Sequence, residues 1–225
     1  MNTYDFPIAL QLAGRTVVLV GGGKVAQGRL AQLLEVGAKV RVIDPLVKPE
    51  LLPLAAAGHI ELIERAYRRG DCAGAFLVFT AADAPLVNRA VVQEARSLGI
   101  LVNAADVPEL CDFTMPSIGR RGPVTIAVST SGRAPALSRV IRKRAMVAIG
   151  EEFGTLARLL GRRRALDPGG PKRAAKLQAV IDAGAAELIA LERKRELWSE
   201  IRRIWQGPLV TLLDSATAGL NEVDL

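Results

Sequence analysis

Apolar residues in the first half of the chain follow two alternating patterns. Short apolar runs bounded by glycine or polar residues are typical of strands buried on both faces of a parallel sheet, and they predict strands at 16–20, 39–43, 60–63, 75–80 and 100–103. Apolar residues at helical spacing predict helices over 24–36 and 85–98. Because strands and helices alternate, we predict an α/β fold with a Rossmann-type doubly wound parallel sheet.

The pattern changes near residue 106. The stretch 113–130 predicts a hairpin or a pair of extended strands around a turn, and most of the chain beyond it has helical character, including a long stretch over 172–205. We therefore expect three parts: a nucleotide-binding Rossmann domain over 1–113, an extended segment over 114–150 and a helical C-terminal domain over 151–225.

Residues 21–26, Gly-Gly-Gly-Lys-Val-Ala, fit the pattern G-x-G-x-x-A between the first predicted strand and the first predicted helix. In that pattern Gly21 allows a tight turn, and Gly23 leaves room for a pyrophosphate to approach backbone N–H groups. These groups and the positive end of the helix dipole bind the phosphates. The alternative is a glycine turn without a ligand. The predicted dinucleotide contacts are Gly21, Gly22, Gly23, Lys24 and Val25.

Asp44 ends the second predicted strand, 21 residues after Gly23. A carboxylate near this spacing accepts hydrogen bonds from a ribose diol and repels a 2′-phosphate, so the predicted cofactor is NAD rather than NADP. The alternative is that Asp44 serves as a turn former before Pro45.

The basic charge of the chain lies in its second half. The formal net charge is +7, with −1 over 1–113 and +8 over 114–225, and seven basic residues without an acid stand from Arg120 to Arg144. A solvated helix face would explain this run, and so would a surface that binds nucleic acid, anionic lipid or a small molecule with many carboxylates. Few aromatic residues and no RRM, KH or zinc signature argue against nucleic acid.

Composition and cysteine usage argue against several protein classes. Cys72 and Cys111 make no disulfide scaffold, no apolar run approaches the ~20 residues of a membrane span, and no basic residue precedes Arg15 as a signal peptide would require. We therefore expect a cytoplasmic protein with no membrane partner. His59, the only histidine, has no acid or cysteine cluster at ligand spacing, so no metal site is predicted.

Three segments of the chain together resemble one known family. They are 17–43, 77–88 and 101–144, which carry the glycine loop, N-x-x-D at 103–106, F-x-M-P-S-I at 113–118 and V-S-T-x-G-x-x-P at 128–135. These residues resemble the precorrin-2 dehydrogenase and sirohydrochlorin ferrochelatase family, the N-terminal module of siroheme synthase. Ser131 and Ala134 stand where the family usually has glycine and serine.

The resemblance implies NAD-dependent oxidation of precorrin-2 to sirohydrochlorin, a tetrapyrrole, and in some members insertion of Fe²⁺ as a second substrate. It implies a homodimer in which the segment 114–150 intertwines between subunits. The chain length leaves no room for the fused methyltransferase of siroheme synthase. A non-catalytic, NAD-binding redox-sensing module stays the alternative, because such modules share the glycine loop. They lack the block at 101–144, which this chain has.

The resemblance also assigns residues to the site. Asp106 would be the catalytic carboxylate, taking the proton released on oxidation or orienting the pyrrole N–H groups. Further cofactor contacts would come from Pro45, Thr80, Ala81 and Asn103. Because the tetrapyrrole carries many carboxylates, the basic segment would bind them. The predicted substrate contacts are Arg120, Arg121, Thr130, Arg133 and Arg139.

Overall fold

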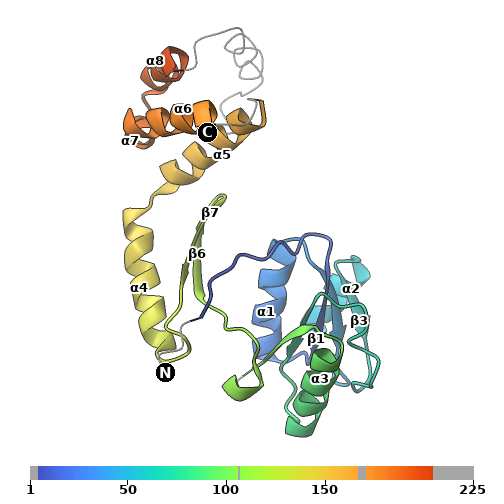
Figure 1. Cartoon of the computed structure of the whole chain (residues 1–225). Coiled ribbons are helices and arrows are strands. Elements are labelled where there is room, and N and C mark those ends of the chain that lie inside the picture. The colour runs from blue at the N-terminus through green and yellow to red at the C-terminus, as the bar shows by residue number, and fades with distance from the viewer. Residues whose placement is uncertain (1–4, 106, 167–170, 205–225) are drawn as a thin grey trace. The chain divides into compact units, whose positions relative to one another are not determined.

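The computed structural model describes residues 5–105, 107–166 and 171–204, and Figure 1 traces the helices and strands. The chain divides into two compact units after residue 115, and residues 131–133 group with the first unit. The two units contain separate clusters of buried apolar residues, so each has a hydrophobic core of its own.

A five-stranded parallel sheet in the order β3-β2-β1-β4-β5 forms the centre of the first unit. Its strands are β1 (Thr16–Val20), β2 (Lys39–Ile43), β3 (Ile60–Ile63), β4 (Leu77–Thr80) and β5 (Leu101–Ala104). Val20 pairs with Ile43 on one side and with Thr80 on the other, so the carboxyl ends of β1, β2 and β4 meet at one edge. The predicted Rossmann-type sheet is confirmed, with β4 and β5 starting slightly later than predicted.

Helices cover both faces of this sheet because its strand residues are apolar on both sides. The helices are α1 (Lys24–Glu35), α2 (Leu52–Ala56) and α3 (Pro85–Ser97), with a 3₁₀ turn, η1, at Pro49–Leu51. Val17 and Leu19 of β1 lie in one core with α1 and η1, whereas Val18 and Val20 lie in the other with α3. Full burial of each such side chain stabilises the fold by about 1.5–3 kcal/mol.

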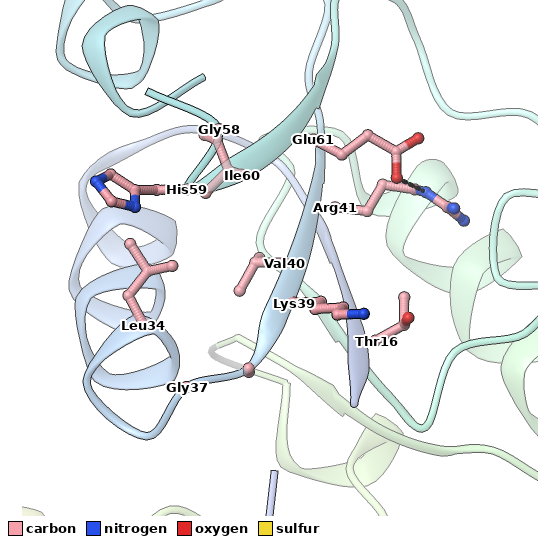
Figure 2. A pocket seen from close by; sticks show the side chains of 11 residues that line it. Thr16, Leu34, Gly37, Lys39, Val40, Arg41, Gly58, His59, Ile60 and Glu61 are labelled. Atoms are coloured by element: carbon pink, nitrogen blue, oxygen red, sulfur yellow. Dashed lines mark hydrogen bonds and ion pairs between the residues drawn. The ribbon is translucent and has the colours of Figure 1, made fainter. Parts of the chain in front are cut away.

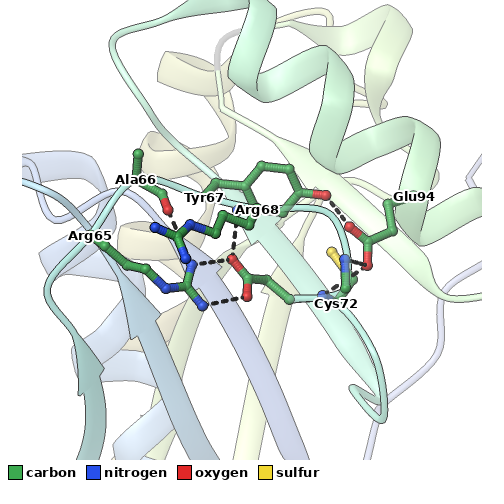
Figure 3. A network of polar contacts seen from close by, with 8 residues as sticks. Arg65, Ala66, Tyr67, Arg68, Cys72 and Glu94 are labelled. Atoms are coloured by element: carbon green, nitrogen blue, oxygen red, sulfur yellow. Dashed lines mark hydrogen bonds and ion pairs between the residues drawn. The ribbon is translucent and has the colours of Figure 1, made fainter.

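The connection from β3 to β4 has no helix and is held by polar contacts to α3 (Figure 3). The buried carboxylate of Glu94 accepts hydrogen bonds from the N–H groups of Gly70 and Cys72, at 2.9 and 3.2 Å. The Tyr67 hydroxyl also donates to Glu94, and burial with this bond raises the pKa of Tyr67. Three donors thus satisfy one buried carboxylate, which attaches the connection to the helix.

An ion pair joins two residues within the same connection between β3 and β4. Arg65 donates two hydrogen bonds of 2.8 Å to the carboxylate of Asp71, and the N–H of Arg68 donates a third at 2.7 Å (Figure 3). The guanidinium holds the pKa of Asp71 below its usual range. This two-bond geometry fixes both side chains, so the connection has a defined shape without secondary structure.

In the second unit the described residues form a hairpin and five helices. They are β6 (Ser117–Arg121), β7 (Val124–Val128), α4 (Pro135–Ala148), α5 (Glu151–Leu166), α6 (Pro171–Asp182), α7 (Ala185–Ala190) and α8 (Lys194–Ile204). The antiparallel hairpin turns at Gly122, whose φ is +52°. Helix α4 packs closely on β6, because Gly119 has no Cβ where Met146 approaches.

Helices α5 to α8 enclose a third core that includes Leu156, Val180 and Leu197. The helical stretch predicted over 172–205 contains α6, α7 and α8, and Gly184 adopts a left-handed backbone with φ of +73° between α6 and α7. Across the described residues, no helix has both the length and the apolar character needed to span a membrane.

Candidate functional site

The glycine loop lies where β1 ends and α1 begins, at the carboxyl edge of the sheet. Gly21 has a φ of +105°, and its N–H donates to the Ile43 carbonyl at 2.8 Å. A Cβ atom on Gly21 would lie 2.5 Å from the Ala81 carbonyl oxygen. A Cβ atom on Gly22 would lie 2.7 Å from Oδ2 of Asp44. A side chain at Gly21 would therefore clash with backbone, whereas one at Gly22 would displace the Asp44 carboxylate.

Gly23 differs from both, because its φ is −67° and a Cβ atom on it would meet nothing within 4 Å. No side chain caps the start of α1, and Lys24 and Val25 in its first turn are exposed. Helix α1 is 12 residues long, so its first N–H groups and its dipole attract an anion beside Gly23. This open space beside unpaired donors fits the pyrophosphate of a dinucleotide.

Asp44 follows β2 and turns its carboxylate toward the glycine loop. Its Oδ1 accepts a hydrogen bond of 2.6 Å from the N–H of Leu46, which closes a turn around Pro45. Its Oδ2 faces Gly22. The two interpretations of Asp44 are therefore compatible, because one oxygen makes the turn while the other lies where a ribose diol would bind. The contact itself, like that of Pro45, stays a prediction.

At the end of β4 the Thr80 side chain is engaged inside the protein. Its buried hydroxyl donates to Oδ1 of Asn88 at 2.6 Å, and its carbonyl accepts the N–H of Ala105 at 2.8 Å. Asn88 also accepts from the Ala82 N–H at 3.1 Å and donates to the Ala82 carbonyl at 2.8 Å. The loop after β4 thus presents backbone at Ala81, beside Gly21, rather than the Thr80 hydroxyl.

Sequence reasoning missed Asn88 as a residue that shapes the site. Asn88 is buried on α3, in a helix whose other buried positions include Val91, Val92 and Ala95. A lone amide among apolar inward positions is a signal that a buried polar partner exists. The partner is not visible in the sequence, because it depends on how α3 packs over the end of β4.

At the end of β5 two side chains hold the chain that follows. Asn103 donates from Nδ2 to the Phe113 carbonyl at 2.8 Å and to Sγ of Cys111 at 3.4 Å. The Cys111 thiol donates to the Ala104 carbonyl at 3.1 Å, and burial raises its pKa, so it stays protonated at neutral pH. Asp106 lies between these contacts in the sequence but outside the described residues, so its catalytic role stays a prediction.

Arg121 and Thr130, two of the predicted substrate contacts, bind groups at the two ends of α4. Arg121 donates to the Ile149 carbonyl at 3.2 Å and pairs with Glu151 at 3.2 Å, which ties β6 to the end of α4. The Thr130 hydroxyl accepts the Ala134 N–H at 3.0 Å and lies 3.1 Å from the Ser138 hydroxyl, so it caps the start of α4. Both groups hold α4 in place, and their contact with a substrate stays a prediction.

The other predicted substrate contacts differ in their exposure. Arg120 is half-buried on β6, whereas Arg133 and Arg139 are exposed. Between Thr130 and Arg133, Ser131 adopts a φ of +50°, a left-handed backbone that glycine adopts without strain. The family pattern has glycine at this position, and this chain keeps the conformation with a serine.

A hollow of about 830 Å³ lies at the opposite end of the sheet, around the amino ends of β1, β2 and β3 (Figure 2). His59 and Leu34 line one side of it, and the Arg41–Glu61 ion pair of 2.8 Å lies on another. Open α/β sheets bind ligands at the carboxyl ends of their strands, so this hollow is not the predicted cofactor site. Within the described part of the chain, no three His, Cys, Asp or Glu side chains cluster as metal ligands.

Two family models match consecutive parts of the chain. A model described as putative NAD(P)-binding matches residues 8–117. A second model, described as sirohaem biosynthesis protein central, matches residues 121–144. Together they cover the glycine loop, the sequence around residue 106, strand β7 and most of α4.

Curated proteins that are similar in sequence to this chain are named siroheme synthase. A siroheme synthase of Stutzerimonas stutzeri is 36% identical over 95% of this chain and 41% of its own length. One of Methylococcus capsulatus is 40% identical over 90% of this chain and 47% of its own length. The chain thus spans about half the length of these curated relatives.

A solved structure extends the likeness to the fold. The structure titled SirC, precorrin-2 dehydrogenase, matches with a TM-score of 0.72 and 25% identity, covering 88% of this chain and 100% of that one. The NAD(P)-binding and sirohaem models, the relatives and this fold agree with the family that the motifs resemble. The chain belongs to the family of precorrin-2 dehydrogenases and siroheme synthases.

Proposed function

We propose that this protein oxidises precorrin-2 to sirohydrochlorin with NAD, a step of siroheme biosynthesis. The observation that carries the proposal is the carboxyl edge of the sheet. There the open space at Gly23, the start of α1 and Oδ2 of Asp44 lie together as a dinucleotide requires. The membership of the chain in its family supports the substrate and the reaction.

The chain itself would bind the reactants and move a proton. When bound, NAD accepts a hydride from the tetrapyrrole. The N–H groups after Gly23 would hold the pyrophosphate, and Asn88 fixes the loop after β4, whose Ala81 backbone lies beside Gly21. Asp106 would accept the proton that leaves the substrate as the hydride departs, or orient the pyrrole N–H groups. The exposed Arg133 and Arg139 would bind carboxylate arms.

An anaerobic assay tests this function. Purified protein is mixed with NAD⁺ and with precorrin-2 made in situ, and absorbance at 340 nm is followed. We expect NADH to form with the wild type, and Asp106→Ala to keep NADH binding while turnover is lost. NAD binding without tetrapyrrole binding would instead indicate a redox-sensing module, and unchanged turnover in Asp106→Ala would refute the role of that residue.

The proposal includes a homodimer, supported by an exposed apolar stripe on α4. Its members are Leu137, Val140, Ile141 and Val147, which are 51%, 47%, 41% and 87% exposed. They follow helical spacing along one side of α4. Ser138, which is buried, and Met146, which packs against Gly119 of the hairpin, lie on the opposite side. Such a stripe on a single copy marks an interface.

Light scattering after size-exclusion chromatography checks the dimer. We expect the wild type to elute as a dimer and Val140→Asp to shift it toward monomer, because the substitution buries a charge without a partner. Leu98→Asp is the matched control, since Leu98 has a similar exposure of 50% but lies at the end of α3. A Val140→Asp variant that stays dimeric like the control would argue against an α4 interface.

The proposal keeps the three-part division predicted from the sequence: cofactor binding over 1–113, substrate and dimer contacts over 114–150, and a helical part over 151–225. We place the reaction in the cytoplasm, which the free thiols Cys72 and Cys111 support. Insertion of Fe²⁺ into sirohydrochlorin would follow in the same protein, with the ion as a substrate. An anaerobic chelation assay with sirohydrochlorin separates this second activity from the first.

A further inference from the structure

Arg29 places a cation on the sheet near the carboxyl end of β4. It lies in the second turn of α1, half-buried, with its guanidinium carbon 5.1 Å from the centroid of the Phe79 ring. Phe79 precedes Thr80, the last residue of β4, and meets Phe113 edge-on at 5.5 Å. The guanidinium therefore lies one residue before the strand end, on the face of the sheet that α1 covers.

The charge of Arg29 has no carboxylate to balance it among the described residues. Its Nη1 donates to the neutral Oε1 of Gln32 at 3.1 Å, and burial lowers its pKa, with the Cys111 thiol as the other group that acts on it. By contrast, the partly buried Arg65 and Arg121 each pair with a carboxylate. Arginine keeps its charge at neutral pH, so a half-buried guanidinium without a counter-ion is poised for an anionic ligand.

The position of the guanidinium selects among the anions of the reaction. In the strand order β2-β1-β4, Asp44 follows β2, whereas Phe79 lies on β4, so β1 separates Arg29's contact from the ribose position. The pyrophosphate position at Gly23 is served by the N–H groups of α1. The side chain of Arg29 reaches across to β4 instead, on the side of β1 away from β2 and next to β5.

We propose that Arg29 binds a carboxylate arm of the tetrapyrrole, which makes it a substrate-binding residue within the first unit. This inference rests on the proposed function. The planar guanidinium offers a two-bond geometry to a carboxylate and keeps its stack on Phe79 at the same time. Arg29 would thus be a substrate-binding residue that precedes the basic segment by about ninety residues in the sequence.

Binding measurements on purified full-length variants test Arg29. We compare Arg29→Met and Arg29→Lys with Arg15→Met, a matched control whose guanidinium carbon lies 4.2 Å from the Phe76 ring but which is exposed and precedes β1. Sirohydrochlorin is titrated by its absorbance change and NADH by its fluorescence. Thermal unfolding identifies any variant that is not folded.

We expect Arg29→Met to weaken sirohydrochlorin binding by about tenfold or more, the loss of a charge-assisted hydrogen bond. Arg29→Lys should retain part of the affinity, and NADH binding should change less than twofold in both. In turnover, the loss should appear in KM for precorrin-2 and not in KM for NAD. Arg15→Met should bind both ligands like the wild type.

Three results would overturn the inference. Wild-type affinity for sirohydrochlorin in a folded Arg29→Met or Arg29→Lys shows that Arg29 does not bind it. A loss of NADH affinity instead assigns Arg29 to the cofactor. An equal loss in Arg15→Met shows a general effect of removing a stacked cation. A wild type that binds no sirohydrochlorin refutes the proposed function as well, so the two failures are distinguishable.

Discussion

Replacing Gly21 and Gly23 singly with alanine separates the packing of the loop from its ligand binding. In Gly21→Ala the new methyl group stands at φ +105° and 2.5 Å from the Ala81 carbonyl oxygen. The backbone strain costs about 1–3 kcal/mol. Moving the β4–α3 loop aside costs about 1–3 kcal/mol more. The free energy of unfolding should therefore fall by about 2–6 kcal/mol, a large part of the ~5–15 kcal/mol typical of a domain.

In Gly23→Ala the same methyl group enters open space at an ordinary φ of −67°. The chain should be as stable as the wild type, or about 0.4–1 kcal/mol more stable because alanine restricts the unfolded state. The methyl group then occupies the volume that a pyrophosphate needs, so NADH affinity should fall at least tenfold. The two substitutions should therefore change the free energy of unfolding and the NADH affinity in different combinations.

Urea unfolding and NADH titration by fluorescence, run on both variants and the wild type, give these pairs. We expect Gly21→Ala to lose stability together with NADH affinity, and Gly23→Ala to lose NADH affinity alone. Wild-type NADH binding by Gly23→Ala would refute the assignment of the pyrophosphate to this loop. Wild-type stability of Gly21→Ala would refute the close approach of Ala81.

Two further predictions concern single carboxylates. Asp44→Asn keeps the acceptor for the Leu46 N–H but removes the charge beside Gly22, so the preference for NADH over NADPH should fall about tenfold in paired titrations; an unchanged preference would argue against the ribose position. Asp71, whose pKa Arg65 lowers, stabilises the fold above the unfolded-state pKa of about 3.9, and this contribution is lost as pH falls through the lower folded-state value. Asp71→Asn should therefore lower Tm at pH 7 and flatten the fall of Tm below pH 4, and parallel Tm–pH curves would contradict this.

The strands and the glycine loop were predictable from sequence because their signals are local. Runs such as that of β1 are apolar at every position, since both faces of the sheet are covered, and turn glycines mark their ends. Over 172–205 the same local signals predict helical character but not where each helix ends, because helical composition continues through Gly184. That glycine adopts a left-handed backbone between α6 and α7, and both helices contribute buried residues to the third core.

The side-chain partners in the site were not predictable, because they depend on tertiary packing. Arg121 and Thr130 read as substrate contacts in a basic segment, yet both bind α4, which follows them in the chain. No local pattern in their helices marks Asn88 or Arg29 as a site residue. Packing on β4 brings Asn88 to Thr80 and Arg29 to Phe79. Periodicity identifies which face of a helix is inward but not which strand residue it meets.

The stoichiometry of a single anaerobic turnover tests the central claim most directly. Sirohydrochlorin and NADH are quantified together after precorrin-2 is exposed to excess protein and NAD⁺. We expect one NADH for each sirohydrochlorin formed, and both signals should fall together in Gly23→Ala. Sirohydrochlorin formed without NADH, or NADH bound with no tetrapyrrole converted, would contradict it.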